Sequence, residues 1–288
     1  MSGRVVVMSD GSEVYVAQSG RRDGPTIILC DGIGCDGYIW RYIKAAFEPA
    51  FRVLHLHYRG HGLSPVPADP VTLSVEQFAV DVWEVADAFE VDKAILWGHS
   101  MGVQVILESA HLRRDRVLAL IPMCGAYERP LDTVRNGAGG VLLPVISSIL
   151  FARPDTLRRL WRKVVPSEFS YKLAATAEIN AKMIRREDFY PYLEHLARMD
   201  PVVFVQMLNN LAVHSARGYL AELAMPALVF AGSRDNMTPP FLAEELCRQL
   251  PDAALCIIPG GSHAAPVELP DLVTLRAERF LRQHGMMP

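Results

Sequence analysis

Three residues spaced along this chain have the types needed for nucleophilic acyl transfer: a serine, an aspartate and a histidine. Ser100 lies in Gly98-His99-Ser100-Met101-Gly102, a G-x-S-x-G sequence. A serine hydroxyl is a weak nucleophile at neutral pH unless a neighbouring base accepts its proton. An acid must in turn hold the base in the correct tautomer and stabilise its charged form. These residue types together predict a reaction that passes through an acyl-serine.

The residues around Ser100 favour its role as the nucleophile. Ala94 to Trp97 is a short apolar run typical of a buried strand, and Val103 to Glu108 has a helical pattern. A sharp strand-to-helix turn strains the backbone at the serine and leaves no room for side chains at the flanking glycines. The alternative is a serine that only caps the helix.

The base and the acid follow from the chain order serine, acid, histidine that this arrangement uses. His263 and His284 are the two histidines after the apolar run 227–231. His263 directly follows the last apolar run, where a loop projects over the sheet, whereas His284 is close to the chain end. We therefore predict His263 as the base and Asp235, just after 227–231, as the acid. The alternative roles for Asp235 are to cap the next helix or to pair with Arg234.

Two backbone N–H groups are needed to stabilise the oxyanion of the tetrahedral intermediate. We expect one from Met101, directly after the serine, and the other from the glycine-rich segment 31–37. In that segment Ile33 is the first candidate and Gly34 the second. The neighbouring residues expected to contact the substrate are Gly32, Gly34 and His99.

The elements that position these residues are short apolar runs separated by helical patterns. Such runs are typical of parallel strands buried on both faces. With a short N-terminal hairpin they predict an α/β fold, with a mostly parallel eight-stranded sheet and helices on both faces. The runs are 26–30, 53–57, 94–97, 117–122, 227–231 and 254–258.

Residues 128–222 contain several helical stretches and no convincing strand, and they far exceed the length of a crossover between strands. We predict an inserted helical cap there, on a core formed by residues 1–127 and 223–288. If its apolar side chains face the core, they roof an apolar pocket. The alternative is that they pack the cap on itself. Ile146 and Phe204 are the candidates for substrate contact in the cap.

Composition and charge argue against several classes of partner. A net charge of −3 provides no long-range attraction to nucleic acid or anionic lipid. The longest apolar stretch, 137–152, is shorter than the ~20 residues of a membrane-spanning helix. Five cysteines without C-x-x-C spacing, and an N-terminal apolar run too short for a secretory signal, predict a cytoplasmic protein with free thiols.

The histidines His55, His57 and His61, with His99, have spacings at which a metal site is conceivable. No carboxylate or cysteine joins them at ligand spacing, and we therefore expect no metal.

The chain resembles the α/β-hydrolase superfamily, in its capped branch of esterases, lactonases, carbon–carbon hydrolases and cofactor-free haloperoxidases. The residues that carry the resemblance are Gly98-His99-Ser100-Met101-Gly102, Tyr58-Arg59-Gly60-His61-Gly62-Leu63-Ser64, Gly232-Ser233-Arg234-Asp235 and Gly261-Ser262-His263. The resemblance implies a serine mechanism without cofactor or metal. Relatives with an aspartate nucleophile, the haloalkane dehalogenases and epoxide hydrolases, are disfavoured by Ser100. Two departures are Asp31, where the family usually has histidine, and Val103, where many relatives have glycine.

These observations predict hydrolysis of a carboxylic ester or a lactone of a small to medium hydrophobic substrate. Hydrolysis of a carbon–carbon bond beside a ketone is the alternative within the same superfamily. A non-catalytic ligand-binding protein on the same fold is a further alternative, since fold alone does not determine function. The complete set of Ser100, Asp235 and His263 argues against that last reading.

Overall fold

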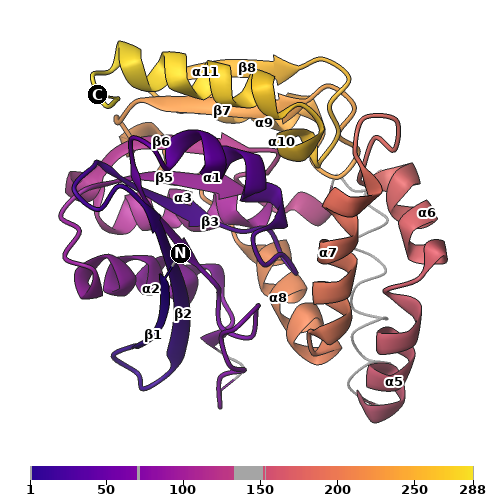
Figure 1. Cartoon of the computed structure of the whole chain (residues 1–288). Coiled ribbons are helices and arrows are strands. Elements are labelled where there is room, and N and C mark those ends of the chain that lie inside the picture. The colour runs from indigo at the N-terminus through magenta and orange to yellow at the C-terminus, as the bar shows by residue number, and fades with distance from the viewer. Residues whose placement is uncertain (1, 70–71, 133–151, 153, 288) are drawn as a thin grey trace.

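In the described residues, which are 2–69, 72–132, 152 and 154–287 of this computed structural model, eight strands form one sheet (Figure 1). Their order across the sheet is β1-β2-β4-β3-β5-β6-β7-β8. The pairs β1·β2 and β2·β4 are antiparallel, and the remaining pairs are parallel. The predicted mostly parallel sheet is thereby confirmed. The strands are β1 (Ser2–Val7), β2 (Glu13–Gly20), β3 (Thr26–Cys30), β4 (Arg52–Leu56), β5 (Ala94–His99), β6 (Val117–Met123), β7 (Ala227–Gly232) and β8 (Ala253–Ile258).

Helices cover both faces of this sheet and create two hydrophobic clusters. Side chains of α2, α3 and α9 belong to one cluster, and side chains of α1 and α11 to the other. The core helices are α1 (Arg41–Phe47), α2 (Val75–Ala88), α3 (Met101–Leu112), α9 (Pro240–Gln249), α10 (Ala265–Glu268) and α11 (Pro270–Gln283). Short 3-10 helices are η1 (Tyr38–Trp40), η3 (Arg114–Arg116), η4 (Pro130–Asp132) and η5 (Leu220–Glu222).

The last strand departs from the prediction that every apolar run is buried on both faces. β8 forms the edge of the sheet and pairs only with β7, and Leu255 in it is 38% exposed. By contrast, every residue of β3, β5 and β7 is buried. Position in the sheet, which an apolar run does not encode, accounts for the difference.

The chain between β6 and β7 contributes a separate group of helices, which Figure 1 shows beside one end of the sheet. They are α5 (Pro154–Val164), α6 (Glu168–Ala177), α7 (Arg186–Arg198) and α8 (Pro201–Val213). Tyr38 of the core packs against α7: the centroid of its ring lies 6.0 Å from that of Phe189 and 5.1 Å from that of Tyr192. Among the described residues, no helix has the length and apolar character that crossing a membrane requires.

The loop 57–64 is held in the core by a buried arginine. Arg59 has no exposed surface and donates two hydrogen bonds to Asp81 of α2, from Nε to Oδ2 at 2.8 Å and from Nη2 to Oδ1 at 2.6 Å. Its Nη1 contacts Asp10 and also donates to Ser12 Oγ at 3.0 Å. Such paired hydrogen bonds compensate for the loss of water around a buried guanidinium.

This loop in turn supports the segment predicted to bind an oxyanion. His61 Nε2 accepts a hydrogen bond from the Gly34 N–H at 2.9 Å. Burial lowers the pKa of His61 to about 4, so that its ring is neutral and has a lone pair to accept this bond. The buried ion pair of Arg59 therefore stabilises a loop whose histidine positions the 31–37 segment.

We predict that Asp81→Ala lowers the free energy of unfolding by about 3–5 kcal/mol, because it leaves the buried Arg59 without its two-point partner. Chemical denaturation followed by circular dichroism measures the change. The matched control is Asp23→Ala, which removes the exposed Arg21–Asp23 pair and should have no measurable effect. Equal stabilities of the two variants would contradict this role for Arg59.

Candidate active site

Ser100 lies at the turn between β5 and α3, with backbone angles φ 54° and ψ −117°. A positive φ is unfavourable for serine and indicates strain that the surrounding structure must maintain. The two flanking glycines make the turn sterically feasible. A Cβ on Gly98 would lie 2.2 Å from the Gly102 carbonyl oxygen, and a Cβ on Gly102 would lie 2.1 Å from that of Cys30. Neighbouring backbone atoms therefore leave no room for a side chain at either glycine, as the sequence predicted.

Val103, one of the two departures from the family pattern, is accommodated by a glycine on the neighbouring segment. Its side chain is fully buried. A Cβ on Gly125, just after β6, would lie only 2.4 Å from Val103 Cγ2. The absence of a side chain at Gly125 thus provides the space that the larger residue occupies.

The structure brings Ser100, His263 and Asp235 together in one chain of hydrogen bonds. His263 Nε2 lies 2.9 Å from Ser100 Oγ, and His263 Nδ1 lies 2.9 Å from Asp235 Oδ2. With a proton on Nδ1 shared with the carboxylate, Nε2 is free to accept the serine proton. The other candidate base, His284, is exposed after α11 and bonds to the Phe280 carbonyl instead.

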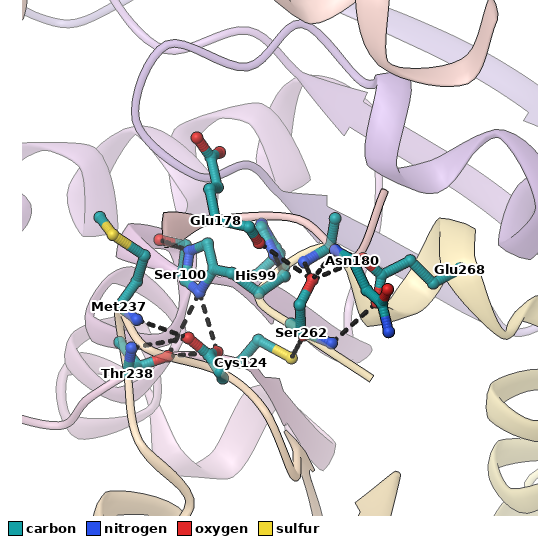
Figure 2. A network of polar contacts seen from close by, with 12 residues as sticks. His99, Ser100, Cys124, Glu178, Asn180, Met237, Thr238, Ser262 and Glu268 are labelled. Atoms are coloured by element: carbon teal, nitrogen blue, oxygen red, sulfur yellow. Dashed lines mark hydrogen bonds and ion pairs between the residues drawn. The ribbon is translucent and has the colours of Figure 1, made fainter. Parts of the chain in front are cut away.

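Asp235 is held rigidly at the end of β7. Its Oδ1 accepts hydrogen bonds from the N–H groups of Met237 and Thr238, both at 2.8 Å. Its Oδ2 accepts from Thr238 Oγ at 2.8 Å as well as from His263. Figure 2 labels Met237 and Thr238, whose N–H groups make the two bonds to Oδ1. Asp235 therefore holds its own turn and also contacts His263; it does not cap the next helix, α9, whose N-cap residue is Pro239.

The charge of Asp235 sets the proton affinity of His263. Burial of the imidazole disfavours its charged form, but the charge and hydrogen bond of Asp235, with the charges of Glu178 and Glu268, together outweigh burial and raise the pKa of His263 above its ordinary value. A base whose pKa is near the working pH both accepts and returns a proton efficiently.

A second buried carboxylate, which sequence reasoning missed, fixes the loop that carries His263. Glu268 at the end of α10 is 6% exposed; its Oε2 accepts from the Ser262 N–H at 2.8 Å, and its Oε1 accepts from Ser262 Oγ and from the Asn180 N–H. Ser262 Oγ is also 2.9 Å from the Glu178 carbonyl oxygen (Figure 2). Glu268 therefore links the histidine loop to the segment after α6. An acid at this position of a short helix has no distinctive sequence signal.

The 31–37 segment approaches the serine closely. A Cβ on Gly32 would lie 3.0 Å from Ser100 Cβ and 3.1 Å from His99 Nδ1. Since the Gly34 N–H is already bonded to His61, it is not available for an oxyanion. Among the described residues, the N–H groups of Ile33 and Met101 have no acceptor within the protein, and both residues line the pocket at Ser100.

Asp31, one of the two departures from the family pattern, has both carboxylate oxygens engaged in hydrogen bonds. Its Oδ1 accepts from Trp40 Nε1 at 2.5 Å, and its Oδ2 lies 2.7 Å from His55 Nε2. Although burial opposes ionisation, the charge and hydrogen bond of His55 lower the pKa of Asp31. The hydrogen bond with Asp31 gives His55 a structural role. Among the described residues, no group of three or more His, Cys, Asp or Glu side chains is arranged to hold a metal ion.

His99 lies behind the nucleophile. Its Nε2 donates to the His263 carbonyl oxygen at 2.9 Å, and its ring centroid is 5.1 Å from that of His263. Burial, followed by the positive charge of His263, lowers the pKa of His99 to about 4. It is not among the described residues that line the pocket at Ser100, so the expected substrate contact of His99 stays a prediction.

A small pocket of about 60 Å³ opens at Ser100. Its polar lining is Gln104, Thr238 and His263 with Ser100 itself. Its apolar lining is Ile33, Met101, Ala126, Pro130, Leu131, Leu208, Leu211 and Met237. Leu208 and Leu211 belong to α8, which therefore reaches the pocket.

Neither of the two predicted cap contacts is tested by the described pocket lining. Phe204, one turn earlier on α8, packs against Trp161 with ring centroids 5.4 Å apart and is not among the described lining residues. Ile146 lies outside the described residues. Both remain predictions as substrate contacts.

Comparison with known proteins adds to this geometry. The sequence model of the family described as "alpha/beta hydrolase fold" matches residues 25–270. Polyketide synthase ThaQ of Burkholderia thailandensis is 30% identical over 92% of this chain, although the chain covers only 12% of that synthase. Pimeloyl-acyl-carrier protein methyl ester esterase of Methylococcus capsulatus is 28% identical, covering 82% of this chain and 85% of the esterase. A solved thermophilic esterase from Thermogutta terrifontis superposes with a TM-score of 0.78 at 20% identity, covering 99% of both chains.

We predict that the pKa of His263 lies above the ordinary value of a histidine and that Asp235→Asn lowers this pKa. The carboxylate stabilises the protonated ring, so its neutral replacement leaves burial, which favours the uncharged ring, as the larger effect. NMR spectroscopy of ring protons measures both values, with the signals of exposed His284 as an internal control. A His263 titration that is the same in both proteins would contradict this electrostatic coupling.

Proposed function

Because this chain belongs to the alpha/beta hydrolase fold family, we propose that it is a serine hydrolase that cleaves a carboxylic ester or lactone through an acyl-enzyme on Ser100. The observation that carries the proposal is the continuous hydrogen-bonded chain from Ser100 Oγ through His263 to Asp235. A serine that only caps a helix does not need a histidine at hydrogen-bonding distance or a buried acid behind it.

In the proposed reaction, His263 Nε2 accepts the Ser100 proton while Oγ attacks the substrate carbonyl carbon. The carbonyl π electrons move to oxygen, and the N–H groups of Ile33 and Met101 stabilise the resulting oxyanion. Protonated His263 then donates its proton to the leaving alcohol as the carbon–oxygen bond breaks. Water, deprotonated by His263, hydrolyses the acyl-enzyme and regenerates Ser100.

In this mechanism Asp235 orients His263 and stabilises its charged form. Its hydrogen bond fixes the proton on His263 Nδ1, and its charge stabilises the imidazolium formed when Ser100 is deprotonated. The two N–H bonds and the hydroxyl bond to Asp235 keep its carboxylate oriented without protein rearrangement. Preorganised dipoles and charges of this kind account for much of enzymatic rate enhancement.

The substrate we propose is a mainly hydrophobic ester with a short group at the Ser100 pocket. The apolar lining and the small volume of that pocket favour such a group. An ester is also the substrate class in the name of the Methylococcus relative. We further propose that residues 128–222 form a cap, because Leu208 and Leu211 of α8 contribute to the pocket wall.

We predict that Ser100→Ala and His263→Ala each reduce ester hydrolysis by about 10⁴-fold or more, because each removes a group that takes part in the covalent step. Hydrolysis of a graded series of esters and lactones, followed by pH-stat titration, measures the loss. Circular dichroism checks that the variants are folded.

The matched control is His284→Ala, which should retain full activity since that ring is exposed and does not contact Ser100. A purified Ser100→Ala protein with more than a few per cent of the original activity would contradict the proposed nucleophile. A larger loss from His284→Ala than from His263→Ala would contradict the proposed base.

A further inference from the structure

Gln104 is a polar side chain that the proposed acyl transfer does not use, although it lies in the wall of the Ser100 pocket. It follows Met101 by three residues on α3, so the two side chains share one face of the helix. Its side chain is 1% exposed. A buried amide beside a reactive serine, surrounded by leucines, must satisfy its hydrogen-bonding groups within the protein or with a ligand.

The nitrogen end of this amide is fully engaged by the segment at the end of α8. Gln104 Nε2 lies 2.9 Å from His214 Nδ1, and it donates to the carbonyl oxygens of Leu211 at 3.4 Å and His214 at 3.3 Å. Reversal of the amide would place its oxygen against these two carbonyl oxygens. The acceptors on this side therefore fix the orientation in which nitrogen faces α8.

A further acid fixes the histidine that accepts from Gln104. His214 Nε2 lies 3.2 Å from Glu108 Oε2, which also accepts a hydrogen bond from the Tyr219 hydroxyl. Since the carboxylate can only accept, the His214 proton lies on Nε2 and Nδ1 is left to accept from the amide. The chain from Glu108 through His214 thus holds Gln104 in one direction.

The oxygen end of the same amide has no partner in the part of the chain that the structure describes. Gln104 Oε1 is nevertheless buried. A buried acceptor without a hydrogen-bond donor destabilises the protein. A binding site with such an acceptor favours a ligand that supplies a donor over an analogue without the donor.

We propose that Gln104 Oε1 accepts a hydrogen bond from an N–H or O–H group of the substrate, and that the substrate is an ester or lactone with this donor on the carbon α or β to the reactive carbonyl. This inference rests on the proposed hydrolase function of Ser100. Four residues of helix rise by about 6 Å, so a donor within a few bonds of the carbonyl reaches from Ser100 to Gln104. The donor is neutral, because the apolar pocket walls disfavour a charged group.

Two matched pairs of esters test this inference. Ethyl N-acetylglycinate has an α-amide N–H, and ethyl 4-oxopentanoate has CH₂ in its place. Ethyl 3-hydroxybutanoate has a β-hydroxyl, and ethyl 3-methylbutanoate has a methyl group in its place. In at least one pair we expect kcat/KM to favour the donor ester by about tenfold or more, and the pair that does so identifies whether the donor is an amide or a hydroxyl.

Gln104→Met, which keeps the length of the side chain but removes its acceptor, should abolish this preference while hydrolysis of the two esters without a donor persists. The matched control is Gln283→Met, which makes the same change on the exposed end of α11 and should keep the preference. Equal kcat/KM within both pairs for the unmodified protein would overturn the inference. So would a preference that survives in Gln104→Met.

Binding to the Ser100→Ala variant separates this inference from the hydrolase proposal. Calorimetry or saturation-transfer NMR should show tighter binding of the donor ester than of its partner, by the same factor of about ten. Preferential binding together with no hydrolysis by the unmodified protein would contradict the proposed reaction but support Gln104 as the acceptor. Hydrolysis of the esters with equal kcat/KM and equal binding within each pair would support the reaction and overturn the role of Gln104.

Discussion

A serine held at positive φ between a buried strand and a buried helix requires unusually close contact between backbone segments. At Ser100 these contacts are between Gly98 and the Gly102 carbonyl, and between Gly102 and the end of β3. The parallel register that pairs Cys30 with Gly98 then places the 31–37 segment beside the serine. The positions of the candidate nucleophile and of the candidate oxyanion donors therefore both depend on the close approach of the Ser100 turn to the end of β3.

Around this turn, buried charges position the functional loops. Asp31 is held by Trp40 and His55, Asp235 by its own turn, and Glu268 by Ser262 and Asn180. Each carboxylate accepts hydrogen bonds that compensate for burial, and these bonds hold the loop in which it lies. Asp235 is the one of the three that also contacts the candidate base.

The sheet, its helices and the proximity of Ser100, Asp235 and His263 could be predicted from the sequence, because they follow from local patterns and chain order. Apolar runs specify strands, and a glycine on each side of Ser100 specifies the turn. Glu268, the bond between His61 and Gly34, and the fit of Val103 over Gly125 could not be predicted, because each depends on which distant segments meet in space. For the same reason the exposed edge position of β8 could not be read from its apolar residues.

In the proposed reaction the substrate acyl group becomes covalently bonded to Ser100. The most direct measurement is mass spectrometry of the enzyme quenched with acid during the first turnover of an activated ester, followed by peptide mapping. We expect the peptide that contains Ser100 to gain the mass of the acyl group less one hydrogen, and to lose it as water completes the reaction. Product formation with no acyl adduct, or with the adduct on a different residue, would contradict it.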